Sequence, residues 1–560
     1  MQFNAKDVLL IDQSGRGHAL CDLFVRTNPH VRVFYGPGSQ LVQHERIHVV
    51  PSIDLDDVTT VVDFCSQHPV DFVFVSFIES LAAGFVDVLQ SHGIPVIGPS
   101  KNAAQLEASK TFANKFCSRY NLPRGVYGVF DNEQEALTYI DSIDYKCVVK
   151  YDGLCKVSDG VTVCDSANEA KSAVKRIFSE EPKARLTIEE RLYGREISIF
   201  ALVDGETTLL FPTAFDYKRV LDSDRGKNCD GMGSIAPHPM EDGELREQIQ
   251  RDILSPFLTG LKEENLDFTG FVYIGAMITD SGLRIIEINT RFGDSEAEAV
   301  LPSIHSDFYA LCQAVLAKEL SQCELAIDGF IRCSVAATQG KLLNSSQNQP
   351  GWPFGEYEVG QVIDGIHTPT EEDWQIFYAG ACYNEARLPV TTSGRVLHVV
   401  GKGKVASKAI DNAYRGIATI DFPGIQYRRD IGASVAHLWQ ERQHDALQLD
   451  WLMILQHALH SSPSKTESTN YFLSVIRTLE ILRSASLALL DGTREASQLA
   501  VLSRELIPEL QSYKKNDLTE YLKQLKKLVG EYRHDTQEKE ATVMMLGALK
   551  LVQPAAAQME

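Results

Sequence analysis

The first hundred residues alternate short, mostly apolar runs with helical segments. Three such runs cover residues 8–11, 70–75 and 95–97. Strands that are covered on both faces read as continuous apolar runs, and strands that alternate with helices form parallel sheets. The pattern therefore predicts a parallel α/β sheet over roughly the first 100 residues.

A polar, glycine-containing turn follows the first of these runs. Residues 12–17 read DQSGRG, and residues 18–20 can continue into a helix. A strand, a turn and a helix in this order present backbone N–H groups and a helix N-terminus to an anion. The turn is a candidate anion-binding site.

The remaining chain divides by pattern into further units. Helical and strand patterns alternate over residues 131–205, and residues 209–289 add strands around a polar loop at 222–230. Shorter strands, one of them at 395–400, predict a small α+β unit that ends near Gly432. Beyond it cysteine is absent and Leu-rich helical patterns dominate, which indicates a separate all-α module.

The predicted fold class is therefore α/β and α+β multidomain. The expected domains are 1–104 (parallel α/β), 105–328 (with a mobile subdomain at about 125–195), 329–432 (α+β) and 433–560 (helical). The helical module reads as a packing or oligomerisation bundle, so a homo-oligomer is a possible partnership.

Composition excludes several classes of function. The 560 residues include no apolar run that could span a bilayer, and the N-terminus lacks the order of a secretory signal, so a cytoplasmic protein without membrane partners is expected. The eleven cysteines contain no CxxC pair, which favours reduced thiols. The net charge of −21 disfavours nucleic acid, so phosphate groups of a ligand must be met by local cations and backbone N–H groups.

One acidic strand carries candidate metal ligands. Residues 283–294 read LRIIEINTRFGD, and side-chain alternation places Glu287 and Asn289 on the same face of the strand. A carboxylate and an amide oxygen are hard ligands suited to Mg²⁺. The alternative is an edge strand whose polar residues are solvated.

Two lysines and one inter-strand link could serve a nucleotide. Lys110 and Lys150 can neutralise a polyphosphate, although each alone is more often a surface residue. Residues 188–198 join two predicted strands and could offer backbone groups to an adenine edge and the Glu196 carboxylate to ribose. An ordinary acidic turn is the alternative reading of that link.

Several short motifs together resemble one enzyme family. They follow the family's order and lie at 97–101 (IGPSK), 103–107 (AAQLE), 109–110 (SK), 231–233 (GMG), 291–296 (RFGDSE) and 427–432 (YRRDIG). On these motifs residues 8–432 resemble the phosphoribosylamine-glycine ligase family of the ATP-grasp superfamily, with the helical module as an addition.

The resemblance implies an ATP-grasp fold and a set of site residues. ATP would contact Lys110, Lys150, Lys156, Glu189, Leu192 and Glu196, while Glu287 and Asn289 would bind Mg²⁺ or Mn²⁺. Arg291, Asp216, Asp294 and Lys218 would form the catalytic and substrate pocket, and Gly15, Arg16 and His18 would bind substrate. The implied chemistry joins small-molecule carboxylate and amine substrates through an acyl phosphate, for which cations and a metal ion matter more than an acid–base pair.

Three departures from the family pattern fall near the expected substrate. Ser14 replaces a glycine of the turn, residues 76–81 (SFIESL) lose two prolines of the family pattern and introduce Phe77 and Glu79, and the flap 152–160 loses two glycines, with its lysine at Lys156. These departures favour a diverged ligase, with an amino acid as carboxylate donor, in specialised metabolism. The alternatives are an authentic phosphoribosylamine-glycine ligase of purine biosynthesis and a catalytically silent ATP-binding regulatory or scaffolding protein.

Overall fold

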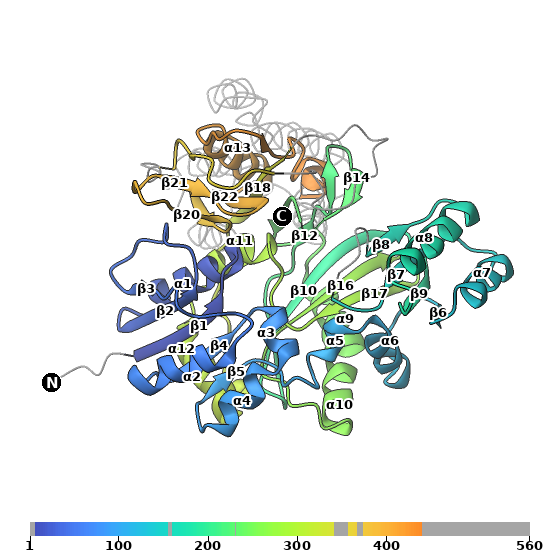
Figure 1. The fold of residues 1–560 in the computed structure, drawn as a ribbon, viewed down its shortest axis with the longest axis horizontal. Coiled ribbons are helices and arrows are strands. Elements are labelled where there is room, and N and C mark those ends of the chain that lie inside the picture. The colour runs from blue at the N-terminus through green and yellow to red at the C-terminus, as the bar shows by residue number, and fades with distance from the viewer. Residues whose placement is uncertain (1–5, 155–159, 230, 341–356, 367–372, 440–560) are drawn as a thin grey trace, which may run out of the picture. The chain divides into compact units, whose positions relative to one another are not determined.

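The computed structural model describes residues 6–154, 160–229, 231–340, 357–366 and 373–439 (Figure 1). Contacts divide the chain into two units, Met1–Ala436 and His437–Glu560. The predicted helical module 433–560 lies almost wholly outside the described residues, and the account below concerns the first unit.

The N-terminal part is the parallel α/β sheet that the sequence predicts. Its five strands are ordered β3-β2-β1-β4-β5, and every pair is parallel. The strands are β1 Lys6–Asp12, β2 Val31–Pro37, β3 Ile47–Val49, β4 Phe72–Val75 and β5 Val96–Ile97, and the helices among them are α1 Gly15–Thr27, α2 Val58–Gln67, α3 Ile78–Ala83 and α4 Phe85–Ser91.

Side-chain alternation on β1 explains why both faces of this sheet are covered. Val8 and Leu10 belong to a buried cluster that includes Phe24 of α1, whereas Leu9 and Ile11 belong to one that includes residues of α2 and α4. A strand buried on both faces needs a continuous apolar run, as residues 8–11 provide. The polar turn after β1 is thereby fixed at the sheet's carboxyl edge.

Two four-stranded sheets follow in the middle of the unit. The first has the order β6-β9-β7-β8 with helices α7 and α8, and the second has the order β11-β10-β16-β17. Their bounds are β6 Tyr127–Phe130, α7 Glu133–Ser142, β7 Cys147–Tyr151, β8 Val161–Val163, α8 Ala167–Glu180, β9 Leu186–Glu190, β10 Arg195–Val203, β11 Thr208–Leu210, β16 Gly270–Thr279 and β17 Gly282–Asn289.

Further helices lie between these strands along the chain. They are α5 Gln105–Ala108, α6 Lys110–Arg119, α9 Gly243–Ile249, α10 Ser255–Glu263, α11 Glu296–Val300 and α12 Phe308–Ala317, with a π-helical turn at Gln250–Leu254. Ser109 caps α6 by accepting a hydrogen bond from the Phe112 N–H, so the motif residues 109–110 mark a helix start.

A third, six-stranded sheet combines residues from two parts of the sequence. Its path is β12-β15-β18-β22-β19, with β23 paired to β18 and helix α13 packed against it. The bounds are β12 Phe215–Asp216, β15 Gly233–Ala236, β18 Ile331–Gln339, β19 Trp374–Tyr378, β22 Arg395–Gly403, α13 Ala406–Ile417 and β23 Ile425–Gln426. Strands β12 and β15 come from the predicted middle domain and extend the C-terminal sheet.

Part of the predicted polar loop at 222–230 is a strand. Strands β13 Arg219–Leu221 and β14 Arg225–Asn228 pair as a hairpin. The other small hairpin pairs β20 Ala381–Tyr383 with β21 Pro389–Thr391. The mixed α/β and α+β class is confirmed, and none of the helices in the described ranges is long and apolar enough to cross a membrane.

Candidate active site

Strand β17 places the predicted metal ligands as the sequence indicates. Glu287 pairs with Gly275 and Asn289 with Tyr273, so the two side chains lie on one face of the strand. Asn289 is buried, and Glu287 is partly exposed. A carboxylate oxygen and an amide oxygen thus lie side by side where the strand ends.

Lys218 lies between two of the predicted acidic residues. Its ammonium nitrogen is 2.9 Å from Oε1 of Glu287 and 3.4 Å from Oε2 of Glu196. Burial raises the pKa of Glu287, but Lys218 and Lys110 outweigh that effect and hold the pKa well below its usual range. Burial likewise disfavours charge on Lys218, and Glu287 overcomes it and raises the lysine pKa. Both groups are therefore charged, and the carboxylate is ready to bind a cation.

Lys150 and Glu189 form a buried ion pair. The Lys150 ammonium is 2.8 Å from Oε2 of Glu189 and donates to the Ile286 carbonyl at 2.9 Å. Burial raises the pKa of Glu189, yet Lys150 and Arg124 lower it further than burial raises it. Asn114 also donates to Glu189, at 2.9 Å. The Glu189 carboxylate is therefore used within the protein.

Two further nucleotide candidates lie in the link between β9 and β10 and at the start of α6. Residues 188–198 join β9 to β10, as the sequence predicts, and Leu192 lies in the link between the two strands. Lys110 is the first residue of α6, and its ammonium donates to the Glu107 carbonyl at 3.4 Å. Lys156 lies outside the described residues, as does the rest of flap segment 155–159.

Arg291 is held by a carboxylate that the sequence analysis did not select. Its guanidinium lies 2.9 Å from Oε1 of Glu107, which is buried, and donates to the Phe292 carbonyl at 3.1 Å. The other oxygen of Glu107 accepts from the Thr290 N–H at 2.6 Å. The available signal for this positioning role was that Glu107 is the one charged residue of the motif AAQLE.

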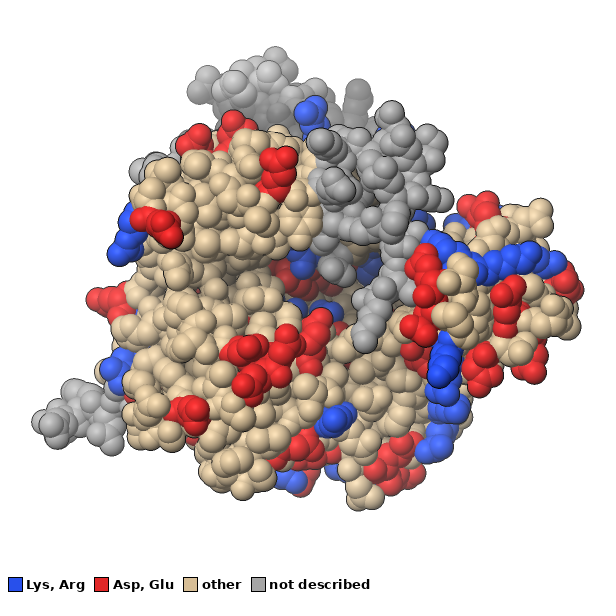
Figure 2. Space-filling model, in the orientation of Figure 1, with Lys and Arg blue, Asp and Glu red and all other residues tan. Residues whose placement is uncertain are grey.

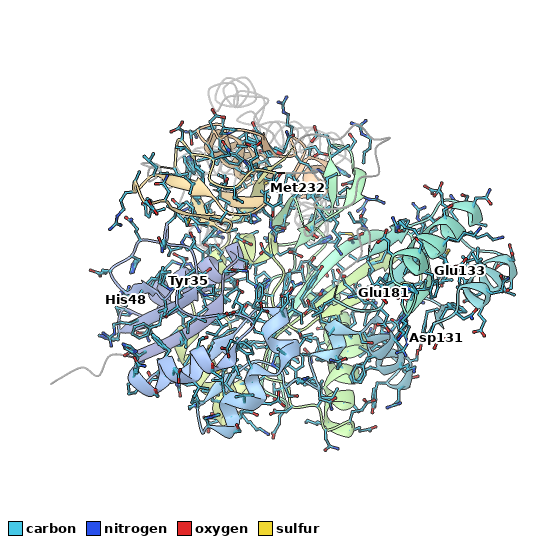
Figure 3. All side chains as sticks on the ribbon, viewed as in Figure 1. Tyr35, His48, Asp131, Glu133, Glu181 and Met232 are labelled. Carbon is cyan, nitrogen blue, oxygen red and sulfur yellow. The ribbon has the colours of Figure 1, made fainter. Side chains whose placement is uncertain are left out.

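The turn after β1 is held together by its own side chains. Helix α1 begins at Gly15, and the Ser14 hydroxyl donates to Oδ1 of Asp12 at 2.7 Å. Arg16 donates to Asp12 at 2.9 Å and to the Ser76 hydroxyl at 3.1 Å. Tyr35, labelled in Figure 3, donates through its hydroxyl to the Ser14 carbonyl at 3.0 Å. The guanidinium of Arg16 is therefore fixed mainly within the protein.

His18 points away from this turn. Its Nδ1 accepts from the Tyr378 N–H at 2.9 Å, and its ring stacks on that of Tyr378 at a centroid distance of 5.5 Å. Burial lowers the pKa of His18 to about 3. The three predicted substrate residues Gly15, Arg16 and His18 are thus close in sequence, but the histidine contacts β19 of the C-terminal sheet.

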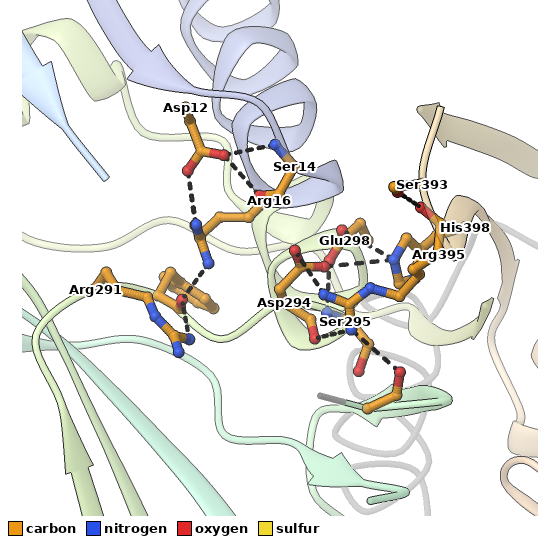
Figure 4. A network of polar contacts seen from close by, with 12 residues as sticks. Asp12, Ser14, Arg16, Arg291, Asp294, Ser295, Glu298, Ser393, Arg395 and His398 are labelled. Atoms are coloured by element: carbon orange, nitrogen blue, oxygen red, sulfur yellow. Dashed lines mark hydrogen bonds and ion pairs between the residues drawn. The ribbon is translucent and has the colours of Figure 1, made fainter. Parts of the chain in front are cut away.

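Asp216 and Asp294 occupy opposite electrostatic environments. Burial, followed by the Glu296 carboxylate, raises the pKa of Asp216 well above its usual value. Burial opposes ionisation of Asp294 too, but Arg395 at 2.9 Å holds that pKa well below its usual value. Ser295 lies between them and donates to Asp216 at 3.3 Å. Figure 4 shows Asp294 facing Arg395.

These residues belong to the strands and turns around the middle of the unit. Figure 2 shows acidic and basic side chains gathered around a recess at the centre of the viewed face. The structure brings together Lys218, Glu196, Glu287 and Asn289. On the other side of the site, Arg16 and Arg291 both donate to the Phe292 carbonyl, two residues before Asp294. Such a site can neutralise a polyphosphate and hold a carboxylate beside it.

Three domain models of one family match most of the described chain. The N domain of phosphoribosylglycinamide synthetase matches residues 6–107, its ATP-grasp (A) domain matches 108–297, and its C domain matches 347–434. The phosphoribosylamine–glycine ligase of Caldanaerobacter subterraneus is 35% identical over 433 residues, which cover 76% of this chain and 99% of that protein. The corresponding ligase of Mesorhizobium japonicum is 36% identical over 429 residues, covering 76% and 97%.

Solved structures agree with the sequence comparisons. The phosphoribosylamine–glycine ligase of Thermotoga maritima has a TM-score of 0.64 and 28% identity, covering 76% of this chain and all of that one. The biotin carboxylase domain of Hydrogenobacter thermophilus 2-oxoglutarate carboxylase, solved with MgADP, has a TM-score of 0.57 at 14% identity, covering 78% and 93%. The second likeness concerns the fold alone.

Proposed function

Since this chain belongs to the phosphoribosylglycinamide synthetase family, we propose that it joins phosphoribosylamine to glycine at the expense of ATP. The chain is an ADP-forming ATP-grasp ligase that makes a C–N bond. An ATP-grasp domain implies ATP and a divalent cation, whereas the choice of Mg²⁺ over Mn²⁺ belongs to the proposal.

The relatives favour this substrate pair over the diverged ligase that the sequence departures suggested. Proteins bearing the phosphoribosylamine–glycine ligase name match along 97–99% of their own length, and nothing in the comparisons supports specialised metabolism. Two of the changed positions are accommodated locally, because the hydroxyls of Ser14 and Ser76 both hydrogen-bond within the network of Asp12 and Arg16. These serines alter the wall of the pocket, and Arg16 remains in place.

One observation carries the proposed chemistry: Lys218 bridges Glu287 and Glu196 beside Asn289. Glu287 and Asn289 fit a divalent cation, because both present oxygen ligands on one strand face and Glu287 is held ionised. When bound, such a cation neutralises the ATP phosphates. Lys110 and Lys150 would add positive charge on the same triphosphate.

The proposed reaction has two steps. Arg291, positioned by Glu107, holds the glycine carboxylate, whose oxygen attacks the γ-phosphorus of ATP so that ADP leaves and an acyl phosphate forms. The amine of phosphoribosylamine then attacks the acyl carbon, the amide bond forms, and inorganic phosphate leaves. Lys218 stabilises negative charge that develops on the transferred phosphoryl group.

ADP release tests the substrate assignment. Purified full-length protein is supplied with ATP and Mg²⁺, then with glycine plus phosphoribosylamine, and separately with a panel of other amino acids and amines. The proposal expects turnover that requires both glycine and phosphoribosylamine. Faster turnover with another pair would support the diverged ligase, and ATP binding without ADP from any pair would support the silent ATP-binding protein.

A further inference from the structure

A second cluster of metal-ligating side chains lies behind the proposed active site. Asp294 follows β17, Glu298 is on α11, and His398 is on β22 of the C-terminal sheet. Glu298 and His398 are fully buried, and Asp294 is 9% exposed. Figure 4 shows the three side chains pointing toward one another.

The atoms that face one another in this cluster have no hydrogen-bond partner. They are Oδ1 of Asp294, Oε1 of Glu298 and Nε2 of His398. Buried polar atoms are almost always hydrogen-bonded, and each exception needs a physical explanation. Three exceptions that converge on one point have a common explanation if a ligand binds at that point.

Two separations among these atoms are close to those around a tetrahedral metal ion. Nε2 of His398 is 3.4 Å from Oδ1 of Asp294 and 3.7 Å from Oε1 of Glu298, and all three atoms lie within 4.8 Å of one another. Ligands bound at about 2.0–2.2 Å to a tetrahedral Zn²⁺ are about 3.3–3.6 Å apart. The separations are long for direct hydrogen bonds and suitable for a bridging cation.

The other polar atoms of the same side chains are already positioned by neighbours. Oδ2 of Asp294 pairs with Arg395 at 2.9 Å, and Oε2 of Glu298 accepts from the Ser295 N–H at 3.1 Å. Nδ1 of His398 lies 3.5 Å from the Ser334 hydroxyl. Outer contacts of this kind orient ligands in metal sites. Each residue therefore keeps one oriented atom for the centre of the cluster.

We propose that Asp294, Glu298 and His398 bind a divalent cation of the zinc class, separate from the ATP-associated cation at Glu287 and Asn289. An imidazole with two carboxylates suits Zn²⁺, whereas Mg²⁺ prefers oxygen ligands in octahedral geometry. The ion would tie α11 and β22 together beside the first residue of α1. The close approach depends on Gly15, where an added Cβ would lie 2.2 Å from Oε1 of Glu298.

The electrostatics of the cluster support a cation. Burial, followed by the Asp294 carboxylate, raises the pKa of Glu298 well above its usual range. A divalent ion between the two carboxylates would offset the repulsion between them and would accept the imidazole nitrogen as a further ligand.

Metal analysis of the full-length protein tests the proposal. The protein is stripped with a chelator, incubated with Zn²⁺ or with Mg²⁺ alone, desalted, and analysed by mass spectrometry for metals. The wild type should retain about one Zn²⁺ per chain and no Mg²⁺. Co²⁺ in place of Zn²⁺ should give the visible absorption bands of a four-coordinate ion.

Matched variants locate the ion. His398→Ala and the isosteric Glu298→Gln should each weaken Zn²⁺ binding at least about tenfold. Glu287→Ala should retain Zn²⁺, and so should His305→Ala, which removes an exposed histidine that lies 3.6 Å from Asp328. Circular dichroism shows whether each variant is folded, and Glu298→Gln keeps the test valid if His398→Ala does not fold.

Two results would overturn the proposal. The first is a wild-type protein that retains no Zn²⁺ after reconstitution, because the three groups would then share only protons. The second is Zn²⁺ binding that is unchanged in folded Glu298→Gln and His398→Ala. Neither result depends on ligase turnover, so failure of the zinc proposal would leave the proposed substrates unaffected.

Discussion

The ammonium of Lys218 lies 2.9 Å from the carboxylate of Glu287, on the strand that also carries Asn289. The lysine comes from the segment between β12 and β13, far in sequence from β17. A cation already accompanies the predicted metal ligand, so Glu287 can remain ionised before nucleotide and metal arrive. Activity should therefore depend sharply on this carboxylate.

Glu287→Ala should abolish most of the ligase activity. Removal of the carboxylate takes away a metal ligand and leaves Lys218 with Glu196 alone. We expect kcat to fall by about 10²–10³-fold, the loss typical of a group that stabilises transition-state charge. ADP release under saturating substrates measures the effect. Glu263→Ala, which alters an exposed carboxylate on α10, is the control. Near-normal turnover by Glu287→Ala would remove Glu287 from the metal site.

Lys150→Ala should destabilise the protein as well as weaken ATP binding. Loss of the ammonium leaves the Glu189 carboxylate buried, with Arg124 at 3.7 Å as its remaining ion-pair partner. Breaking a buried pair costs about 3–5 kcal/mol, and we expect the lower end because Arg124 remains. Urea unfolding monitored by circular dichroism gives the free energy of unfolding.

A second substitution separates charge from packing at this position. Glu189→Gln in the Lys150→Ala background removes the carboxylate charge that has lost its lysine partner. It should recover part of the lost free energy of unfolding. No recovery in the double variant would mean that the lysine stem, and not its charge, stabilises β7 and β9.

His18 should make stability fall in mild acid. Its folded pKa of about 3 lies below the ordinary value of 6.5, so the unfolded chain takes up a proton that the folded protein refuses. As the pH decreases from 6.5 toward 3, this residue should lower the free energy of unfolding by up to about 1.4 kcal/mol per pH unit. Above pH 6.5 it should contribute nothing.

Urea titrations between pH 5 and 7.5 check this dependence. His18→Gln keeps an acceptor for the Tyr378 N–H and should flatten the pH dependence relative to wild type. His92→Gln changes an exposed histidine and should leave the wild-type slope. Equal slopes in wild type and His18→Gln would show that His18 is protonated in the folded protein.

Gly15→Ala should be far more harmful than a glycine change at another helix start. The added methyl group would lie 2.2 Å from Glu298 and 2.9 Å from the His398 ring, so the contact between α1 and α11 must open. We expect a loss of about 1–3 kcal/mol in the free energy of unfolding. Gly243→Ala is the matched control, because that glycine starts α9 and its added Cβ has nothing within 4 Å.

Gly243→Ala gives the reference value of unfolding stability for this comparison. Gly243→Ala should be neutral or slightly stabilising, since alanine reduces the conformational freedom of the unfolded chain. Thermal unfolding of both variants under one condition gives the difference directly. Equal effects at the two glycines would mean that α1 moves away from Glu298 at little cost.

Features with a local sequence signature were predictable. The parallel sheet follows from apolar runs such as 8–11, and the common face of Glu287 and Asn289 follows from strand alternation. The β13–β14 hairpin was missed because 222–230 is polar. Its turn uses positive φ angles at Ser223 and Asp224, a feature that DSD signals less clearly than Asn-Gly would.

Contacts between distant segments were not predictable in the same way. Glu107 binds the backbone of Thr290 across 183 positions, and it also holds Arg291. His398 reads in sequence as a polar residue in the mostly apolar strand 395–400, and only the fold brings it to Asp294 and Glu298. Local periodicity contains no information about such partners. Assignments that rest on resemblance, including Leu192 and Glu196, remain predictions.

The shared C-terminal sheet also limits how this enzyme could exchange parts with its relatives. Strand β15 pairs with β18 from Gly233 opposite Val335 to Ala236 opposite Arg332, and β12 continues the same ladder. A recombination event that replaced residues 329–432 alone would set a foreign β18 against a resident β15. The two stretches are therefore expected to be inherited as one block, and a working chimera would have to carry β12 and β15 along with the C-terminal strands.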